Sequence, residues 1–171
     1  PVVAIYSTFL QRAYDQILID VCMQNLPVTF CIDRAGIVGA DGETHHGVFD
    51  ISYLISMPNL MIFAPSDRRE LEEMLEYAVF SECPCAVRYP RGAAPAPLCG
   101  SGERRENAKK DPGDRGTEEA FLQARVLREG SDVTIISAGE MTRECAESCR
   151  ILESRGIRAE LIDARVLKPL D

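Results

Sequence analysis

The chain has 171 residues, of which 46% are hydrophobic and 27% are charged, a composition that is ordinary for a folded globular protein. Its formal net charge of −8 at pH 7 argues against broad contact with nucleic acid or with an anionic membrane surface. No apolar run reaches the roughly 18 residues that a membrane span needs and no signal-peptide pattern is present, so we expect a cytoplasmic protein.

Strands and helices are predicted to alternate over the first half of the chain. Apolar residues recur at helical spacing over residues 10–22, which predicts one amphipathic helix. Strands that alternate with such helices form a parallel sheet covered on both faces, so we predict an α/β fold with ligands at the carboxyl ends of its strands. Short apolar runs predict these strands over residues 2–6, 27–32, 59–64 and 85–89.

A second helix of the first half is predicted to begin at Ser66, whose side chain suits a helix cap. Its apolar residues repeat with helical spacing and define one inner face. We expect this face to bury Leu71, Met74, Leu75, Ala78 and Val79.

A change in composition divides the chain after residue 98. Residues 99–120 contain no Val, Ile, Leu or Phe, and Gly, Arg, Glu, Lys and Asp dominate, so we predict a flexible linker that trypsin cuts first. Strands are then predicted over residues 126–128, 132–137 and 160–166, with a helix over residues 142–155 that Gly156 ends. We therefore expect a first domain over residues 1–98 and the start of a truncated second α/β domain over residues 121–171.

The seven cysteines are an odd number without a secretory signal, which favours reduced thiols. Cys83 and Cys85 lack metal-ligand spacing, and no metal ligands are predicted in this chain. Cys145 and Cys149 share a helical stripe with Leu152, so we expect them to be buried.

The segment with most chemical information is residues 33–47, which follows the second predicted strand. Four glycines allow backbone turns there, and Arg, Asp and His lie among them. Arginine suits bidentate phosphate binding, aspartate can bind substrate hydroxyls, and histidine can move protons near neutral pH. The alternative is a glycine-rich turn with surface charges, since the glycine spacing matches neither a dinucleotide fingerprint nor a P-loop.

Two further strand ends carry candidate site residues. Arg88 and Arg91 flank a turn and suit an anion, although one of them can instead pair with a surface acid. Arg91 lies past the strand and before Gly92, which makes it the better candidate. At the turn after the first strand, Phe9 is either a core residue or a platform for a cofactor ring.

These runs closely resemble the 1-deoxyxylulose-5-phosphate synthases, a transketolase-like family that depends on thiamine diphosphate. The resemblance rests on residues 4–16, residues 33–42 with Thr44 and His45, and residues 86–92. Residues 132–141 and 162–171 resemble the start of the C-terminal domain of the same family. The resemblance therefore implies a partial pyrimidine-binding domain with a parallel sheet, followed by the start of a transketolase C-terminal α/β domain.

The resemblance also implies a reaction. The family joins pyruvate to glyceraldehyde 3-phosphate with loss of carbon dioxide, using thiamine diphosphate and Mg²⁺, and so feeds isoprenoid, thiamine and pyridoxal synthesis. By position, Phe9 matches the aromatic residue that packs on the aminopyrimidine ring of the cofactor, and Arg12 belongs to the same pocket wall. The full-length enzyme is expected to be a homodimer.

The remaining matches concern the acceptor substrate. Tyr6, Arg34 and Arg91 match residues around the acceptor phosphate. Asp41 and His45 match polar residues that face the reacting carbons, which implies catalytic roles for both. The neighbouring histidine stands where relatives often carry another polar residue, and we expect solvent or a nearby acid as its partner.

Two features of the family are not found in this sequence. One is the N-terminal domain that holds Mg²⁺ and the cofactor diphosphate, and the other is the glutamate that helps to form the ylide. We therefore expect a piece of a longer synthase that is inactive alone. Two alternatives are a transketolase or E1 β-type chain that a partner chain completes, and a non-catalytic remnant that keeps the fold.

Overall fold

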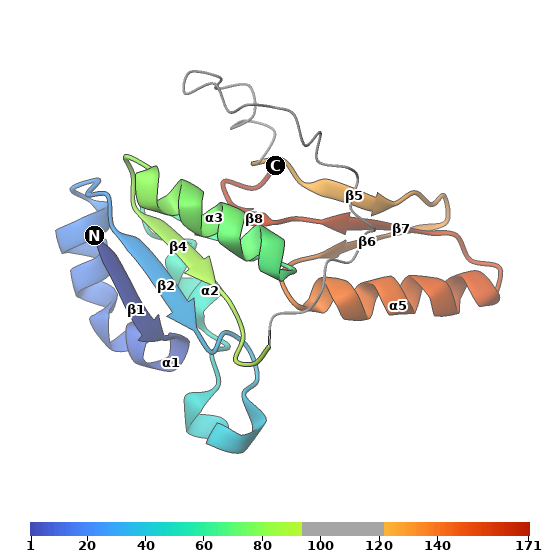
Figure 1. Ribbon diagram of the computed structural model, residues 1–171, viewed down its shortest axis with the longest axis horizontal. Helices are drawn as coiled ribbons and strands as arrows, with labels where there is room; N and C mark the ends of the chain where they lie inside the picture. Colours follow the sequence, from blue (N-terminus) through green and yellow to red (C-terminus); the bar gives the residue numbers. More distant parts are fainter. Residues whose placement is uncertain (94–121) are drawn as a thin grey trace.

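The computed structural model describes residues 1–93 and 122–171, and these residues form two β-sheets (Figure 1). The predicted α/β class is confirmed. The first sheet has the strand order β1 (Val2–Tyr6), β2 (Thr29–Asp33), β4 (Cys85–Arg88), β3 (Met61–Phe63) and β8 (Val166–Lys168). The second sheet has the order β5 (Arg125–Arg128), β7 (Ala159–Asp163) and β6 (Val133–Ser137).

Parallel pairing brings the site-bearing strand ends of the first sheet together. β1 pairs with β2, and β2 with β4, all in parallel. Tyr6 is opposite Asp33, and Ile32 is opposite Arg88. The carboxyl ends of these strands therefore lie at one edge of the sheet. β8 departs from the predicted pattern, because it runs antiparallel to β3.

Both faces of the first sheet carry a hydrophobic cluster, because successive strand side chains point to opposite faces. On β4, Ala86 belongs to one cluster, while Cys85 and Val87 belong to the other. α3 covers one face, and the helical segments after β1 and β2 cover the other (Figure 1). β1 lies at the end of the strand order, and Val2 is 57% exposed there.

The predicted helix over residues 10–22 is instead three short segments. They are α1 (Ser7–Leu10), a 3₁₀-helix (Gln11–Ala13) and a π-helix (Gln16–Cys22). The backbone hydrogen bonds of a π-helix join residues that are five apart. Ile17 and Cys22 are five residues apart and both face the core, where they are buried. The prediction of one apolar face was right, and that of one regular helix was wrong.

α3 (Arg68–Phe80) begins one residue later than the predicted cap implies. Asp67, not Ser66, is its N-cap, and the Asp67 carboxylate accepts a hydrogen bond from the Glu70 N–H at 2.9 Å. Met74 and Ala78 are buried as predicted, whereas Val79 is 51% exposed. A further short helix, α2 (Asp50–Leu54), was not predicted.

The second sheet packs one face on α5 (Met141–Ser154), where Cys149 is buried against Ala159 and Leu161 as expected. The predicted strand over residues 160–166 is confirmed as far as Asp163, where β7 ends, but Val166 belongs to a separate strand, β8. The chain bends at Arg165, whose φ is 56°, and Val166 enters the core of the first sheet. Burial of that apolar side chain, fully covered beside Phe63, accounts for the crossover.

Three further sequence predictions concern the linker, the cysteines and membrane spans. The predicted linker over residues 99–120 lies outside the described residues. Six cysteines, all within the described residues, are free thiols. Within residues 1–93 and 122–171, none of the helices has the length and apolar character required to cross a membrane.

Candidate functional site

The candidate site is formed where β1, β2 and β4 end. β1 runs directly into α1, β2 into the loop of residues 34–47, and β4 into the turn that carries Arg91. These segments are far apart in the sequence but meet at the same edge of the first sheet (Figure 1). This is the edge at which open parallel sheets bind ligands.

The loop of residues 34–47 is closed by its own backbone. Gly36 and Gly47 exchange two N–H···O=C bonds of 2.8 Å each. A Cβ on Gly47 would lie 2.3 Å from the Arg34 carbonyl oxygen, so a larger residue cannot occupy this position. Thr8 donates from its hydroxyl to the Thr44 carbonyl at 2.9 Å, which ties the loop to α1.

Aromatic rings connect the end of β1 to this loop. The rings of Tyr6 and Phe9 stack with centroids 5.4 Å apart and planes 10° apart. The Arg34 guanidinium carbon lies 3.7 Å from the centroid of the Tyr6 ring, and that of Arg12 lies 5.3 Å from the Phe9 centroid. The His45 ring meets Phe9 edge-on at 5.6 Å. These cation–π and ring contacts hold cationic and aromatic groups in one layer.

Asp41 lies between two arginines from different strand ends. Its Oδ2 accepts from Arg34 Nε at 2.9 Å, and its Oδ1 pairs with Arg91 Nη1. Arg34 also pairs with Asp33 at 2.8 Å on the other side. Hydrogen bonds from Arg34, and then from Arg91, hold the pKa of Asp41 below its usual value. The side chains of Asp41 and Arg91 are 24% and 47% exposed.

The structure thus brings every sequence-predicted site residue into one connected set of contacts. The ring contacts and ion pairs run without a break through Arg12, Phe9, Tyr6, Arg34, Asp41 and Arg91, with His45 against Phe9.

The two adjacent histidines point to different partners. His45 contacts the Phe9 ring, and its Nδ1 lies 3.0 Å from the Thr44 hydroxyl. His46 instead accepts a hydrogen bond from the Val38 N–H at 3.1 Å, through its Nδ1. His46 therefore holds the loop backbone, and the expectation of solvent or an acid as its partner was wrong.

The arginine that precedes the β4 turn is structural. Arg88 donates to both carboxylate oxygens of Asp50, at 3.1 and 3.3 Å, and Asp50 is only 1% exposed. An acid partner was one of the sequence alternatives, but the acid is buried and begins α2. Arg91, after the turn, remains available to the site loop.

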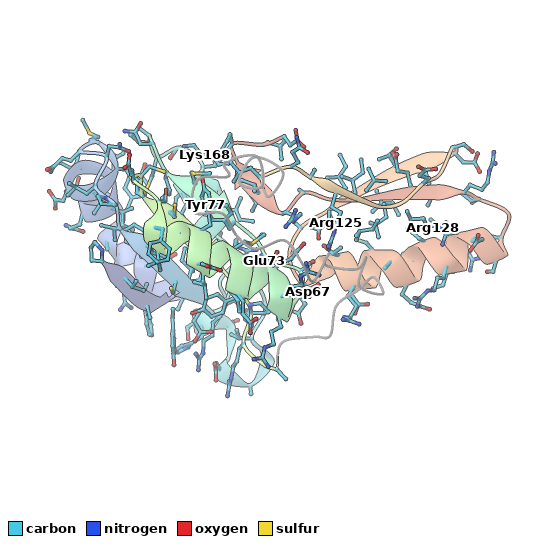
Figure 2. The ribbon with its side chains drawn as sticks, turned by 45° about the horizontal axis from the view of Figure 1, so that its top comes forward. Asp67, Glu73, Tyr77, Arg125, Arg128 and Lys168 are labelled. Atoms are coloured by element: carbon cyan, nitrogen blue, oxygen red, sulfur yellow. The ribbon has the colours of Figure 1, made fainter. Side chains whose placement is uncertain are left out.

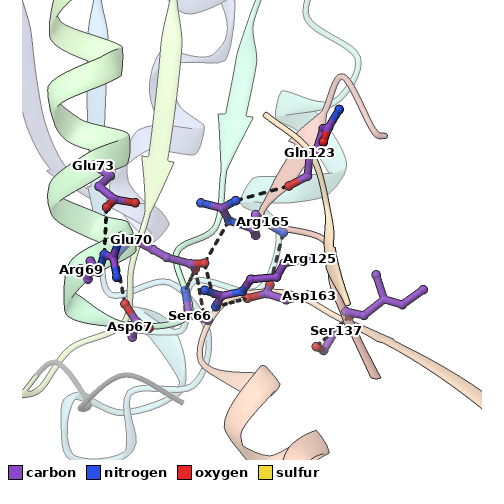
Figure 3. Close-up of polar contacts among 11 residues, drawn as sticks. Ser66, Asp67, Arg69, Glu70, Glu73, Gln123, Arg125, Ser137, Asp163 and Arg165 are labelled. Atoms are coloured by element: carbon purple, nitrogen blue, oxygen red, sulfur yellow. Dashed lines mark hydrogen bonds and ion pairs between the residues drawn. The ribbon is translucent and has the colours of Figure 1, made fainter. Parts of the chain in front are cut away.

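A second charged cluster was not predicted at all. Figure 3 shows Glu70 of α3 reaching toward two arginines, Arg125 of β5 and Arg165 after β7. Glu70 Oε1 lies 3.0 Å from Arg125 Nη2 and 2.9 Å from Arg165 Nε. Glu70 also accepts from the N–H and hydroxyl of Ser66, at 2.9 and 2.8 Å. We call Glu70, Arg125, Asp163 and Arg165 the junction cluster, because it joins α3 to the second sheet.

Asp163 completes the junction cluster at 3.7 Å from Arg125 Nη2 and is fully buried. Burial, and then repulsion from Glu70, raises the pKa of Asp163 to about 6. Figure 2 shows Arg125 near the end of α3 that carries Asp67, with Arg128 farther along the second sheet.

The sequence does carry a signal for the buried acids. Glu70 lies four residues before Met74 and eight before Ala78, so helical periodicity puts it on the buried face. Asp163 shares its strand face with Ala159 and Leu161 by alternation. No sequence rule, however, indicates which arginines meet them.

Two family models match the chain: residues 1–97 match the transketolase pyrimidine binding domain, and residues 122–171 match the transketolase C-terminal domain. The chain belongs to the transketolase family. Its predicted order, a pyrimidine-binding domain followed by a C-terminal domain, is confirmed. Both units lie within the described residues except for residues 94–97.

Curated members of the transketolase family confirm the resemblance seen in the sequence. The 1-deoxy-D-xylulose-5-phosphate synthase of Pelotomaculum thermopropionicum is 54% identical over 171 residues, and that of Halothermothrix orenii is 50% identical. Each alignment covers 100% of this chain and 25% of the relative. The chain thus spans about a quarter of the length of the curated relatives it matches.

Solved transketolases share the fold. A structure described as a split gene transketolase, inactive β4 tetramer, has a TM-score of 0.78 at 28% identity, and the match covers 100% of this chain and 51% of that one. A transketolase variant from Pichia stipitis has a TM-score of 0.80 at 19% identity and covers 97% of this chain and 23% of its own. The second likeness supports the fold alone.

Proposed function

We propose that the chain is part of a 1-deoxy-D-xylulose-5-phosphate synthase, a thiamine-diphosphate-dependent transferase that condenses pyruvate with glyceraldehyde 3-phosphate and releases carbon dioxide. The observation that carries the proposal is the convergence of Arg34 and Arg91 on one carboxylate beside an aromatic layer. The relatives that carry this name, at 50% and 54% identity, support it independently.

The two arginines suit the phosphate of the acceptor. Guanidinium groups bind carboxylates and phosphates with the same fork geometry, and Arg34 and Arg91 already bind the two oxygens of one anion. The Tyr6 ring and Asp33 hold the Arg34 side chain in place, which lowers the entropy cost of binding. We infer that these three, Tyr6, Arg34 and Arg91, bind the acceptor phosphate.

Phe9 is the residue that fits the cofactor best. It is a partly exposed ring at the carboxyl end of β1, beside Arg12 and His45. Bound thiamine diphosphate supplies a ring system that stabilises a carbanion. Phe9 would pack against its aminopyrimidine, and Arg12 would line the same wall.

The metal does not fit the residues that the structure describes. Among residues 1–93 and 122–171, no three His, Cys, Asp or Glu side chains gather in a way that would hold a metal ion. We propose that Mg²⁺ and the cofactor diphosphate are held elsewhere in the full-length protein.

His45 and Asp41 are the groups proposed to act at the reacting carbons. His45 carries an imidazole at the edge of the Phe9 ring, four residues after Asp41 on the same loop. A histidine there can take up or release a proton during carbon–carbon bond formation. Asp41, held ionised by its two arginines, can accept hydrogen bonds from substrate hydroxyls.

The proposal extends to the organisation of the full-length enzyme. We infer a homodimer in the cytoplasm, with the first domain over residues 1–98, a linker over residues 99–120 and the second domain over residues 121–171. A size measurement of the full-length protein and limited trypsin digestion would test these two statements.

A second candidate is a chain that a separate partner completes. It is favoured by the likeness to the split gene transketolase, which is 28% identical and is described as an inactive β4 tetramer. On this reading the chain supplies the aromatic layer and the arginines, and the partner supplies the metal site. Restoration of activity by a separately made N-terminal chain would support it.

The test of the proposal uses Arg34→Ala and Arg91→Ala in the full-length protein. A charge-assisted hydrogen bond contributes about 1.5–3 kcal/mol, so each change should lower kcat/KM for glyceraldehyde 3-phosphate about 10- to 150-fold. Unphosphorylated glyceraldehyde should lose much less, because no phosphate contact is removed. Arg68→Ala, at a 74% exposed side chain on α3, is the control and should change neither value.

Equal losses with both aldehydes would mean that the arginines hold the fold rather than the phosphate. Complete absence of deoxyxylulose phosphate formation by the unaltered full-length protein, with thiamine diphosphate and Mg²⁺ present, would contradict the proposal and favour a non-catalytic remnant.

A further inference from the structure

Asp41 binds both arginines of the proposed phosphate site. One carboxylate oxygen is bonded to Arg34 Nε at 2.9 Å, and the other pairs with Arg91. Asp33 occupies a further donor of Arg34, Nη1, at 2.8 Å. A phosphate cannot use the bonded N–H groups while both carboxylates stay in place, because each N–H makes one strong hydrogen bond.

The position of Asp41 suits a group that can leave. Asp41 lies between Gly39 and Gly42, whose φ angles of 46° and 81° are ones that glycine adopts at little cost. A Cβ added at either glycine meets nothing within 4 Å, so this end of the loop stands clear of packed neighbours. Ion pairs of partly exposed side chains are weak, and the Arg91 side chain is 47% exposed.

Asp33 differs from Asp41 in its backbone setting and in the arginines that it contacts. It is the last residue of β2, held in the sheet opposite Tyr6, and it contacts Arg34 alone of the two site arginines. Its carboxylate also accepts from the Arg34 N–H at 2.6 Å, which fixes the turn after the strand. The contacts of Asp33 therefore hold it beside Arg34, whereas Asp41 can be displaced from its arginines by another anion.

We propose that Asp41 is an internal anion that occupies the acceptor-phosphate site, and that the arriving phosphate displaces it from Arg34 and Arg91. This inference rests on the proposed function, since it takes the two arginines as the phosphate site. Displacement frees a carboxylate on the loop that carries His45, four residues further on. An acceptor without a phosphate leaves Asp41 paired with its arginines. The Asp41 carboxylate is therefore released near the reacting carbons only when the acceptor carries a phosphate.

The first test measures binding of inorganic phosphate to the full-length protein by isothermal titration calorimetry at constant ionic strength. Asp41→Asn removes the competing anion, so phosphate should bind about 2- to 10-fold more tightly than to the unaltered protein. Asp41→Ser is a second variant with the same expectation. Asp33→Asn is the matched control, because it removes an equal charge from Arg34 without freeing Arg91.

The control separates exchange from a plain change in net charge. Under exchange, Asp33→Asn should not tighten phosphate binding as Asp41→Asn does. Equal tightening by the two variants, or weaker binding to Asp41→Asn, would overturn the proposal, since Asp41 would then only add charge or orient the arginines for phosphate.

Kinetics provide the second test. Asp41→Asn should lower KM for glyceraldehyde 3-phosphate while also lowering kcat, a split that a merely structural residue would not produce. A raised KM with unchanged kcat would contradict the exchange. Failure of phosphate to bind either the unaltered protein or Asp41→Asn would instead remove the phosphate site itself, and with it the proposed function.

Discussion

Within the described residues, one arginine–carboxylate cluster lies in the site loop and another of similar composition lies at the junction. The site cluster has Asp33 and Asp41 around Arg34 and Arg91, and two of its side chains are 24% and 47% exposed. The junction cluster pairs Glu70 and Asp163 with two arginines, and its acids are 2% and 0% exposed.

Burial decides what each cluster can do. A buried charge without its partner costs several kcal/mol, so Glu70 and Asp163 must remain paired for α3 and the second sheet to stay joined. A partly exposed pair is worth much less and can exchange one anion for another. The same residue types therefore hold α3 against the second sheet in one place and form a binding site in the other.

The largest expected effect breaks the junction cluster. Glu70→Ala removes the 2% exposed carboxylate that Arg125 and Arg165 share, beside an Arg165 side chain that is itself only 11% exposed. Loss of one partner of a buried ion pair costs about 3–5 kcal/mol, which urea unfolding of the chain should reveal as a lower free energy of unfolding.

Glu72→Ala is the matched control on the same helix. Its side chain is 63% exposed and pairs only locally with Arg68, so the change should cost no more than about 0.5 kcal/mol. Comparable losses for the two variants would mean that the junction cluster contributes nothing special to stability.

A somewhat smaller effect concerns pH. The pKa of Asp163 is raised from 3.8 to about 6, so the folded state binds a proton more tightly than the unfolded state does. The contribution of Asp163 to stability is therefore present in full below about pH 4 and is lost as the pH rises through 6. At about 1.4 kcal/mol for each factor of ten in proton affinity, the free energy of unfolding falls by about 3 kcal/mol over this pH range.

Asp163→Asn removes this titration. Relative to the unaltered chain, the variant should become more stable as the pH rises from 4.5 to 7.5, when urea unfolding is followed at several pH values. Asp20→Asn, at an exposed position, should show no such trend. A difference between Asp163→Asn and the unaltered chain that is independent of pH would contradict the raised pKa.

The site could be predicted from the sequence because its residues lie in short runs at strand ends. Tyr6, Phe9 and Arg12 follow one strand, and Arg34 and Asp41 another, so the rule that parallel strand ends converge brings them together. Their roles came from the resemblance to a family, which the chemistry of isolated side chains cannot supply.

The junction could not be predicted, because nothing local links its parts. Glu70 and Arg125 are far apart in the chain and meet only once the second sheet has docked on α3. The crossover of Val166 into the first sheet has the same origin, since its apolar run reads equally well as the end of β7. The π-helix at Ile17 was also hidden, because apolar spacing does not separate it from a regular helix.

The contrast between the two clusters is tested most directly by NMR of the arginine side chains in the full-length protein. The Nε–H signals of Arg34, Arg91, Arg125 and Arg165 should be followed while inorganic phosphate is added at constant ionic strength. We expect the signals of Arg34 and Arg91 to move along one saturating curve, while those of Arg125 and Arg165 stay in place. Movement of the junction arginines along that same curve, or an unchanged Arg34 signal, would contradict the account.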